Sequence, residues 1–224
     1  VFEEVTPNFF RKSMAYIKER SKEKAPFFLY LALPSPHTPI LPVGEWEGKS
    51  ALNPYGDFMM MLDDYMGQLA NTLKEAGIEE NTMVVFTSDN GCSPAAGIDG
   101  LLAKGHSPSG IYRGHKADIF EGGHRVPFIV KWPAKVRAGT QTDKTICTTD
   151  FLATCADLVG VKLKDDEGED SFSFLPLLND PESPDFLREA TVHHSINGSF
   201  AIRKDNWKMV FCPDSGGWSE PKPN

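Results

Sequence analysis

The sequence has little of what would place it in a familiar metal-binding or disulfide-rich class. No Cys-x-x-Cys pair occurs, which argues against a structural zinc site. The four cysteines are widely scattered, at Cys92, Cys147, Cys155 and Cys212. This spacing leaves two disulfides or four unpaired thiols open, and four unpaired, mostly buried thiols is the simpler interpretation.

Long apolar runs are also absent. The longest, residues 27–33, is far shorter than the roughly 20 residues that a membrane-spanning helix needs, so we expect no membrane span. No signal peptide is recognisable. Because the chain opens on Val1 and not on methionine, this absence says little about the compartment.

Positive charge is in short supply. The formal net charge is -8 and the sequence pI is about 5.3, which argues against a nucleic-acid partner. Such a chain can bind an anion only through a local cluster of Lys, Arg and His. With 40% hydrophobic and 24% charged residues over 224 positions, the composition is that of a soluble globular protein with a sizeable core.

The periodicity of apolar residues predicts an α/β organisation. Helical spacing indicates helices at residues 7–24, with Thr6 as N-cap, at 54–76, closed by Gly77, and at 150–159. Short apolar runs predict buried strands at 27–33, 82–88 and 126–132. The order strand, helix, strand implies a parallel βαβ unit. The Gly- and Ser-rich residues 91–115 read as a long loop, either functional or mobile.

The composition changes at the acidic residues 162–170, and the residues after them have the pattern of short strands. Residues 190–196, 200–203 and 207–211 are predicted to be short strands, with Asn197-Gly198 as a hairpin turn. We therefore expect an α/β domain over residues 1–165 and a small antiparallel α+β subdomain over 166–224. On the strand at 190–196, His193 and His194 should point to opposite faces.

Polar side chains follow two of the predicted strands where each strand ends. His37 follows the first, and Asp89 and Asn90 follow the second. Open α/β sheets bind ligands at this edge, and a carboxylate beside a carboxamide offers the hard oxygens that Ca²⁺ and Mg²⁺ prefer. An ordinary turn is the alternative interpretation of Asp89-Asn90-Gly91, since these residue types are common in turns.

A second cluster concentrates positive charge in this acidic chain. It reads Tyr112-Arg113-Gly114-His115-Lys116, followed by Glu121-Gly122-Gly123-His124-Arg125-Val126-Pro127. Such a patch can hold a sulfate, a phosphate or a carboxylate. The alternative is a solvated basic loop in which the two glycines only form a turn.

Taken in order, these motifs resemble the type I sulfatase family. The resemblance is carried by Phe86-Thr87-Ser88-Asp89-Asn90-Gly91, Gly114-His115-Lys116 and Glu121-Gly122-Gly123-His124-Arg125-Val126-Pro127. Pro36-His37-Thr38-Pro39 resembles the family's upstream histidine motif, and Thr149-Asp150-Phe151-Leu152-Ala153-Thr154 resembles its later helix. Each motif is weak alone, but the ordered set is specific. It covers the chain from about residue 27 to its end.

The resemblance implies an alkaline-phosphatase-like fold and hydrolysis of sulfate esters through a formylglycine nucleophile. It also implies a divalent cation, usually calcium. Asp89 and Asn90 fall on metal-ligand positions, Lys116 on a lysine that contacts sulfate, and His37 on a histidine at the leaving-group oxygen. These roles are chemically sound, because a cation and a lysine neutralise sulfate oxygens and an imidazolium protonates a leaving alkoxide. Substrate contacts are expected from the basic side chains Arg113, His115, His106 and His124, with a buried structural histidine as the alternative interpretation of His124.

The sequence also departs from the family pattern. The nucleophile motif Cys/Ser-x-Pro-x-Arg, which lies upstream of the histidine motif in the family, does not occur here, and neither do the family's further upstream aspartate ligands. Cys92-Ser93-Pro94 imitates its start but lacks the arginine and follows the metal aspartate, so Cys92 is interpreted as structural. Asp63-Asp64 falls within a predicted helix and is interpreted as a solvated helix face or the cap of a loop, in preference to a metal site.

Three interpretations follow. The first is a sulfatase fragment, inactive alone, whose complete enzyme acts on sulfated glycans or aryl sulfates and is periplasmic or secreted by family analogy. The second is a non-catalytic domain or subunit that completes a site with a partner chain. The third is a phosphoryl-transfer relative of the same fold, which the Gly-His-Lys and Glu-Gly-Gly motifs disfavour.

Overall fold

The computed structural model describes residues 2–223, which fall into two compact units. Unit 1 contains residues up to 82 and residues 92–111, and unit 2 contains residues 83–91 and those from 112 onward. The predicted division at residue 165 follows another criterion and stays a prediction. Within residues 2–223, no helix has the length and apolar character to cross a membrane. All four cysteines are free thiols.

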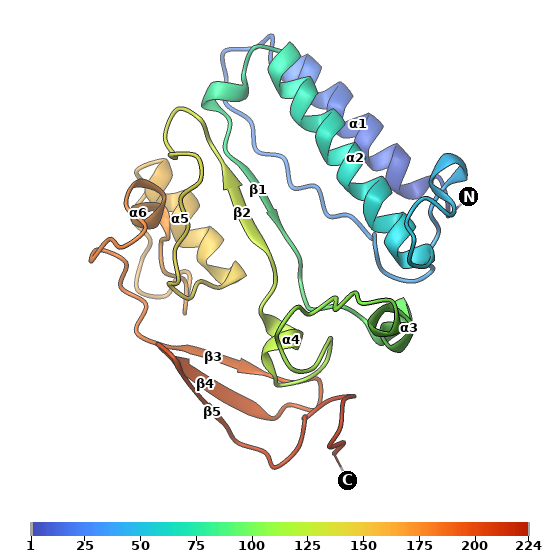
Figure 1. Ribbon diagram of the computed structural model, residues 1–224. Helices are drawn as coiled ribbons and strands as arrows, with labels where there is room; N and C mark the ends of the chain where they lie inside the picture. Colours follow the sequence, from blue (N-terminus) through green and yellow to red (C-terminus); the bar gives the residue numbers. More distant parts are fainter. Residues whose placement is uncertain (1, 224) are drawn as a thin grey trace. The chain divides into compact units, whose positions relative to one another are not determined.

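Unit 1 is built on two long helices that lie side by side, α1 (Val5–Arg20) and α2 (Pro54–Glu75) (Figure 1). Their contact is apolar: Phe10 is fully buried and its ring stacks on Tyr65, with 5.1 Å between the centroids. Burying a side chain such as Phe10 contributes about 1.5–3 kcal/mol. The predicted helices are thus confirmed.

The ends of these helices follow capping chemistry, with one correction. Asn53 caps α2, since its side-chain oxygen accepts from the Gly56 amide at 3.1 Å, and Gly77 follows the helix with a φ of 71°. The prediction of Thr6 as the cap of α1 was wrong. Thr6 lies inside the first turn, where its hydroxyl donates to Ser35 at 3.0 Å.

The predicted strand at residues 27–33 is not formed. This stretch has no strand assignment, and its side chains alternate between half-buried and exposed, with Phe28 77% and Tyr30 80% exposed. The prediction of a strand buried on both faces was wrong, because apolar composition alone does not provide a covering layer. The parallel βαβ unit that depended on this strand is therefore not present in the described chain.

Short helices occupy the rest of unit 1. They are η1 (Gly44–Trp46), η2 (Glu79–Asn81), η3 (Pro94–Ala96) and α3 (Ile98–Ala103). The last two fall inside residues 91–115, so the expected uninterrupted loop is in part helical. Asn53 holds this segment through a hydrogen bond from Nδ2 to the Ala96 carbonyl at 2.8 Å, and Leu101 is fully buried.

Unit 2 contains a two-stranded ladder of β1 (Val84–Thr87) and β2 (Phe128–Lys131). The two strands are antiparallel, with Val84 opposite Lys131 and Thr87 opposite Phe128. Both strands were predicted from the sequence, without a prediction of how they pair with each other. Phe128 continues into an aromatic cluster with Phe151 and Phe174, whose ring centroids are 5.3–5.6 Å apart.

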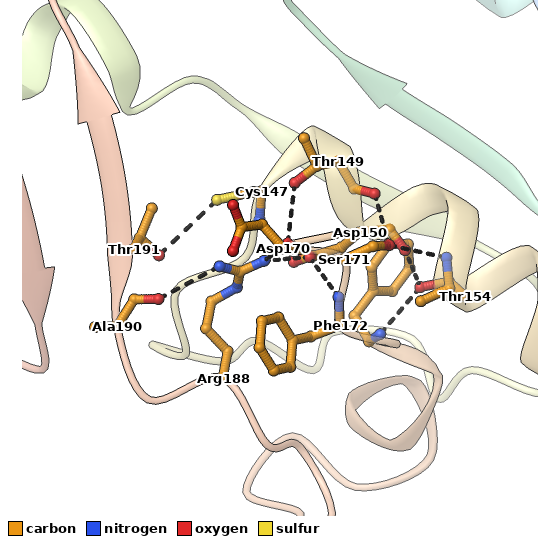
Figure 2. Close-up of polar contacts among 12 residues, drawn as sticks. Cys147, Thr149, Asp150, Thr154, Asp170, Ser171, Phe172, Arg188, Ala190 and Thr191 are labelled. Atoms are coloured by element: carbon orange, nitrogen blue, oxygen red, sulfur yellow. Dashed lines mark hydrogen bonds and ion pairs between the residues drawn. The ribbon is translucent and has the colours of Figure 1, made fainter. Parts of the chain in front are cut away.

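The helices of unit 2 are α4 (Glu121–His124), η4 (Thr148–Asp150), α5 (Phe151–Leu158) and α6 (Leu175–Asn179). A buried polar network surrounds the start of α5 (Figure 2). The fully buried Asp150 accepts from the Cys147 amide at 2.8 Å and the Phe172 amide at 2.9 Å, and it pairs with Arg188. This carboxylate thereby joins three segments that are far apart in the sequence.

The C-terminal sheet is antiparallel, as predicted, in the order β3 (Thr191–His194), β4 (Phe200–Lys204), β5 (Trp207–Val210). The expected turn joins β3 to β4, with Gly198 at a φ of 78°. His194 is exposed and His193 half-buried, so the two histidines face opposite sides of the sheet as expected.

Candidate functional site

The Asp-Asn-Gly turn follows β1 directly. Asp89 is exposed, while Asn90 is half-buried and donates from Nδ2 to the Gly91 carbonyl at 3.1 Å. This assignment of the amide leaves the Asn90 side-chain oxygen available as an acceptor. The turn therefore presents a carboxylate and an amide oxygen, the donor types that a hard divalent cation takes.

Close backbone contact ties this turn to α4. The Gly91 amide donates to the Gly123 carbonyl at 3.0 Å, and a Cβ on Gly91 would lie 1.8 Å from the Gly122 oxygen. On its other side, the Gly122 amide donates to the Arg113 carbonyl at 2.8 Å. Only glycine permits these approaches. The Asp89–Gly91 turn, α4 and Arg113 at the start of the basic cluster are thus joined by hydrogen bonds within unit 2.

The loop from Arg113 to Asp118, named here the anion loop, has an unusual backbone. Gly114 has a φ of 81° and Ala117 a φ of 82°, although Ala117 carries a Cβ. The His115 Nδ1 lies 3.0 Å from the Lys116 carbonyl, so that nitrogen carries a proton and Nε2 is left for other contacts. Lys116 itself is half-buried.

Asp118 closes the anion loop and was not singled out from the sequence. Its carboxylate is fully buried and accepts from the backbone amides of His115 at 2.8 Å, Trp218 at 2.8 Å and Ser219 at 3.0 Å. The Ser219 hydroxyl donates to it as well. Burial alone would raise the pKa of Asp118, but these hydrogen bonds from Ser219, His115 and Trp218 outweigh burial and lower it.

Glu121, the first residue of α4, is the centre of an ion-pair network with β4 and β5. Its carboxylate accepts from Arg203 at 2.6 Å and from Lys208 at 2.9 Å, and Lys208 also donates to the Ile119 carbonyl at 2.6 Å. Partial burial raises the pKa of Glu121, and the hydrogen bonds and charges of Lys208 and Arg203 together lower it below its ordinary value. The network anchors α4 on the C-terminal sheet.

The two histidines beside this network form a ring pair. The His124 ring packs on His193 with 4.4 Å between centroids. Desolvation, aided by the Lys208 charge, lowers the pKa of both rings, and that of His193 falls to about 4. Both are therefore neutral at pH 7, although His124 keeps an exposed part. No described donor or acceptor meets the buried His193 Nε2.

Two arginines, the first residue of the anion loop and one in the segment after it, have their guanidinium groups on aromatic rings. Arg113 lies 3.9 Å above the Phe120 ring and donates to the Glu220 carbonyl at 3.2 Å. Arg125 lies 4.8 Å above the Tyr112 ring. Arg113 is exposed, so stacking holds its charge in place while leaving it accessible.

The other predicted site residues belong to unit 1. His37 is exposed and its Nδ1 lies 2.9 Å from the Thr38 carbonyl, which leaves Nε2 outward. His106 is exposed at the end of the α3 region. The structure does not place these two side chains relative to Asp89, Asn90 or Lys116. Their convergence stays a prediction.

Cys92 and the acidic pair in α2 have the surroundings expected of structural residues. Desolvation raises the pKa of the half-buried Cys92 thiol despite a hydrogen bond with Tyr55, so the reactive thiolate is disfavoured. Asp64 lies within α2 and accepts from Gln68 at 2.6 Å. Residues 2–223 contain no cluster of three or more His, Cys, Asp or Glu side chains arranged to hold a metal.

A turn with hard oxygen donors is therefore hydrogen-bonded through glycines to a basic loop. Comparison with known proteins identifies the class to which the chain belongs. The family model described as Sulfatase matches residues 5–161, and the model for the N-sulphoglucosamine sulphohydrolase C-terminal region matches residues 113–219. The chain therefore belongs to the sulfatase family.

Comparisons with individual proteins agree with this family assignment. The chain is 35% identical over 216 residues to an N-acetylgalactosamine-6-O-sulfatase of Bacteroides thetaiotaomicron, covering 95% of this chain and 41% of that protein. It is 35% identical over 158 residues to human steryl-sulfatase, covering 69% and 26%. The chain thus spans less than half the length of these relatives.

Solved structures give the same assignment. One from a study of glycosaminoglycan metabolism by B. thetaiotaomicron superposes with a TM-score of 0.84 and 34% identity, covering 94% of this chain and 43% of that one. A sulfatase from Pseudoalteromonas sp. superposes with a TM-score of 0.80 and 28% identity, covering 94% and 41%. The expected fold class, part of an alkaline-phosphatase-like α/β domain with a small antiparallel subdomain, is confirmed.

Proposed function

We propose that this chain carries the sulfate-binding part of the active site of a sulfuric ester hydrolase. The observation that supports this best is the backbone connection between the Asp89–Gly91 turn, α4 and the anion loop, through Gly91 to Gly123 at 3.0 Å and Gly122 to Arg113 at 2.8 Å. It holds oxygen donors for a cation and a lysine for an anion on one rigid backbone. Family membership supplies the reaction class.

Each residue has a distinct role in this proposal. The Asp89 carboxylate and the Asn90 amide oxygen hold a divalent cation, for which calcium is the family's usual choice. Bound there, the cation would polarise the sulfate ester. Lys116 contacts a sulfate oxygen and neutralises its charge. His37, protonated on the outward Nε2, donates a proton to the departing alkoxide, while its Nδ1 stays bonded to Thr38.

The remaining candidate side chains would bind the rest of the substrate. Arg113, held on Phe120 but exposed, presents a fixed positive charge suited to an anionic sugar substituent. His115, His106 and His124 are the further substrate-binding candidates. A relative that acts on N-acetylgalactosamine 6-sulfate groups, by its name, supports a sulfated sugar as substrate. Aryl sulfates are the second choice.

Two features of the complete enzyme belong to the same proposal. The nucleophile is a formylglycine from a Cys/Ser-x-Pro-x-Arg motif, which these 224 residues do not contain. The enzyme acts in the periplasm or outside the cell, as the family analogy indicates. Reading the encoding frame upstream of Val1 tests the first point directly. A start codon close to Val1, with no such motif, would contradict it and favour a non-catalytic subunit.

The activity is tested on the product of the complete reading frame with 4-methylumbelliferyl sulfate and a 6-sulfated N-acetylgalactosamine. Lys116→Ala should lower kcat/KM by about 100-fold or more, because a charge that stabilises the transition state is lost. His37→Ala should lower it by a similar factor, about 100-fold. Lys164→Ala, at an exposed lysine of unit 2, is the matched control. Wild-type rates in the Lys116 variant would contradict the proposal.

A further inference from the structure

The fully buried carboxylate of Asp118 lies directly behind the anion loop and is not among the residues assigned a role above. Four donors converge on it. Oδ2 accepts from the His115 amide and the Ser219 hydroxyl, and Oδ1 accepts from the Trp218 and Ser219 amides. Both oxygens are thus saturated by neutral donors, three of which are backbone amides. Such a group fixes the backbone around it and is not free to react.

The backbone next to Asp118 has a conformation that contacts with the surrounding structure must stabilise. Ala117, between Lys116 and Asp118, has a φ of 82°, a left-handed conformation that a residue with a Cβ adopts only when its surroundings impose it. Gly114 has a φ of 81°, and a Cβ there would lie 2.8 Å from the Asp118 carboxylate. The loop therefore curls around the carboxylate. The direction in which Lys116 leaves the loop depends on this curl.

The other partner of Asp118 is a segment about a hundred residues later. Residues 215–219 pack against the loop, with the Ile119 amide donating to the Ser215 carbonyl at 2.8 Å. A Cβ on Gly217 would lie 2.6 Å from both the Ala117 carbonyl and Asp118 Oδ1. Asp118 is the side chain that both segments share. The C-terminal segment is thereby a structural part of the anion loop.

We propose that Asp118 is a positioning residue for sulfate binding: by joining the anion loop to residues 215–219, its carboxylate sets the backbone from which Lys116 reaches the anion. This rests on the proposed function of Lys116. A second consequence concerns His115, whose Nδ1 lies 3.4 Å from Asp118 Oδ2 as well as 3.0 Å from the Lys116 carbonyl. Asp118 thus also keeps the His115 Nε2 directed away from the loop backbone.

Asp118→Asn is the discriminating substitution because it keeps the shape of the side chain. An amide has one oxygen and one NH₂ group, so two of the four donors would face another donor. The anion loop should loosen even though the cavity stays filled. Ser219→Ala is the milder variant, since it removes one hydroxyl donor and leaves the Ser219 amide bond to Oδ1 in place.

The experiment is a titration of the ¹⁵N-labelled chain with sodium sulfate at constant ionic strength, following the amides of His115 and Lys116. Wild type should show saturable shifts. Asp118→Asn should weaken sulfate binding by about tenfold and Ser219→Ala by about threefold, as expected for lost hydrogen bonds to a buried carboxylate. The His115 amide proton should move upfield in Asp118→Asn, because it no longer donates to a charge. A merely structural role would leave the affinity unchanged.

Two further variants distinguish a loss of stability, a failure of the positioning role and a failure of the proposed function. Thr154→Ala controls for lost stability, because it removes two buried hydrogen bonds outside the anion loop, one to the Asp150 carbonyl and one from the Phe174 amide. It should bind sulfate as wild type does. Wild-type affinity in folded Asp118→Asn, or in Ser219→Ala if the former does not fold, would overturn the positioning role alone. Wild-type affinity in Lys116→Met, or no saturable binding by wild type, would overturn the proposed function and the inference with it.

Discussion

The Arg188 guanidinium donates to a carboxylate oxygen of Asp150 in a pair almost closed to solvent, the two side chains being 5% and 0% exposed (Figure 2). Arg188 also donates to the Asp170 carbonyl at 2.9 Å and lies 4.7 Å above the Phe172 ring. Asp150 further accepts two backbone amides. Because water does not reach the Asp150 carboxylate, the stability of this buried charge depends on all of these partners.

Arg188→Met should therefore destabilise unit 2 strongly, since methionine fills the space but leaves Asp150 without its counter-charge. The expected loss is about 3–5 kcal/mol in the free energy of unfolding, measured by urea denaturation. The control is Lys164→Met at the exposed pair of Lys164 with Glu167, which should cost less than about 0.5 kcal/mol. Equal losses of unfolding free energy in the two variants would show that the buried Arg188–Asp150 pair stabilises the protein no more than an exposed pair does.

The elements that the sequence predicted correctly are those determined by local pattern. Helical spacing identifies α1 and α2, and an Asn-Gly turn between short apolar runs identifies β3 and β4. The prediction of a strand at residues 27–33 was wrong for the opposite reason. Whether an apolar run becomes a buried strand depends on neighbouring strands and covering side chains, and these are not encoded in the run.

The same distinction applies to the site. The Asp89–Gly91 turn and the anion loop are recognisable because their motifs are contiguous, and the backbone bonds through Gly122 and Gly123 bring them together. Asp118 is not recognisable, because an aspartate in a turn is ordinary. Its burial comes from Trp218 and Ser219, about a hundred residues later. His37 and His106 belong to the other unit, and their role stays a prediction.

Gly91→Ala tests the connection between the turn and α4. The added Cβ would lie 1.8 Å from the Gly122 oxygen and 2.9 Å from its carbonyl carbon, so the backbone itself must move. We expect a loss of about 2 kcal/mol or more in the free energy of unfolding, the range of strongly overpacked sites. Gly67→Ala in α2, with open space around it, should instead stabilise by about 0.5–1 kcal/mol. Similar behaviour of both variants in thermal melts would rule out a tight contact at Gly91.

The histidine pair should make stability depend on pH. Desolvation and the charge of Lys208 lower the pKa of His193 from 6.5 to about 4. Between these values the unfolded state binds more protons than the folded state, so stability is full above pH 6.5 and falls as the pH drops toward 4. For a half-buried ring we expect a loss on the order of 2 kcal/mol across this window. His193→Gln should reduce the slope, and parallel wild-type and variant curves would contradict the assignment.

The chain by itself should not turn over a sulfate ester. Covalent catalysis requires its nucleophile, and no Cys/Ser-x-Pro-x-Arg motif occurs in the 224 residues. Cys92 does not replace it, because its thiol is half-buried and its pKa is raised by desolvation. The measurement is release of 4-nitrophenol from its sulfate ester by the purified chain with added calcium. Metal-dependent release that disappears in Cys92→Ala would show that this cysteine is the nucleophile after all.

Calcium binding by the chain should be weak. Calcium takes about six to eight oxygen ligands, and Asp89 and Asn90 contribute a small part of that number. Within residues 2–223 no group of three or more His, Cys, Asp or Glu side chains is arranged to hold a metal ion. Isothermal titration should therefore give a dissociation constant above about 1 mM, the weak end of calcium sites in proteins. Asp143→Ala, at an exposed aspartate of the same unit, is the control for nonspecific charge effects. Micromolar affinity that Asp89→Ala abolishes and Asp143→Ala leaves intact would show that the chain contains a complete site.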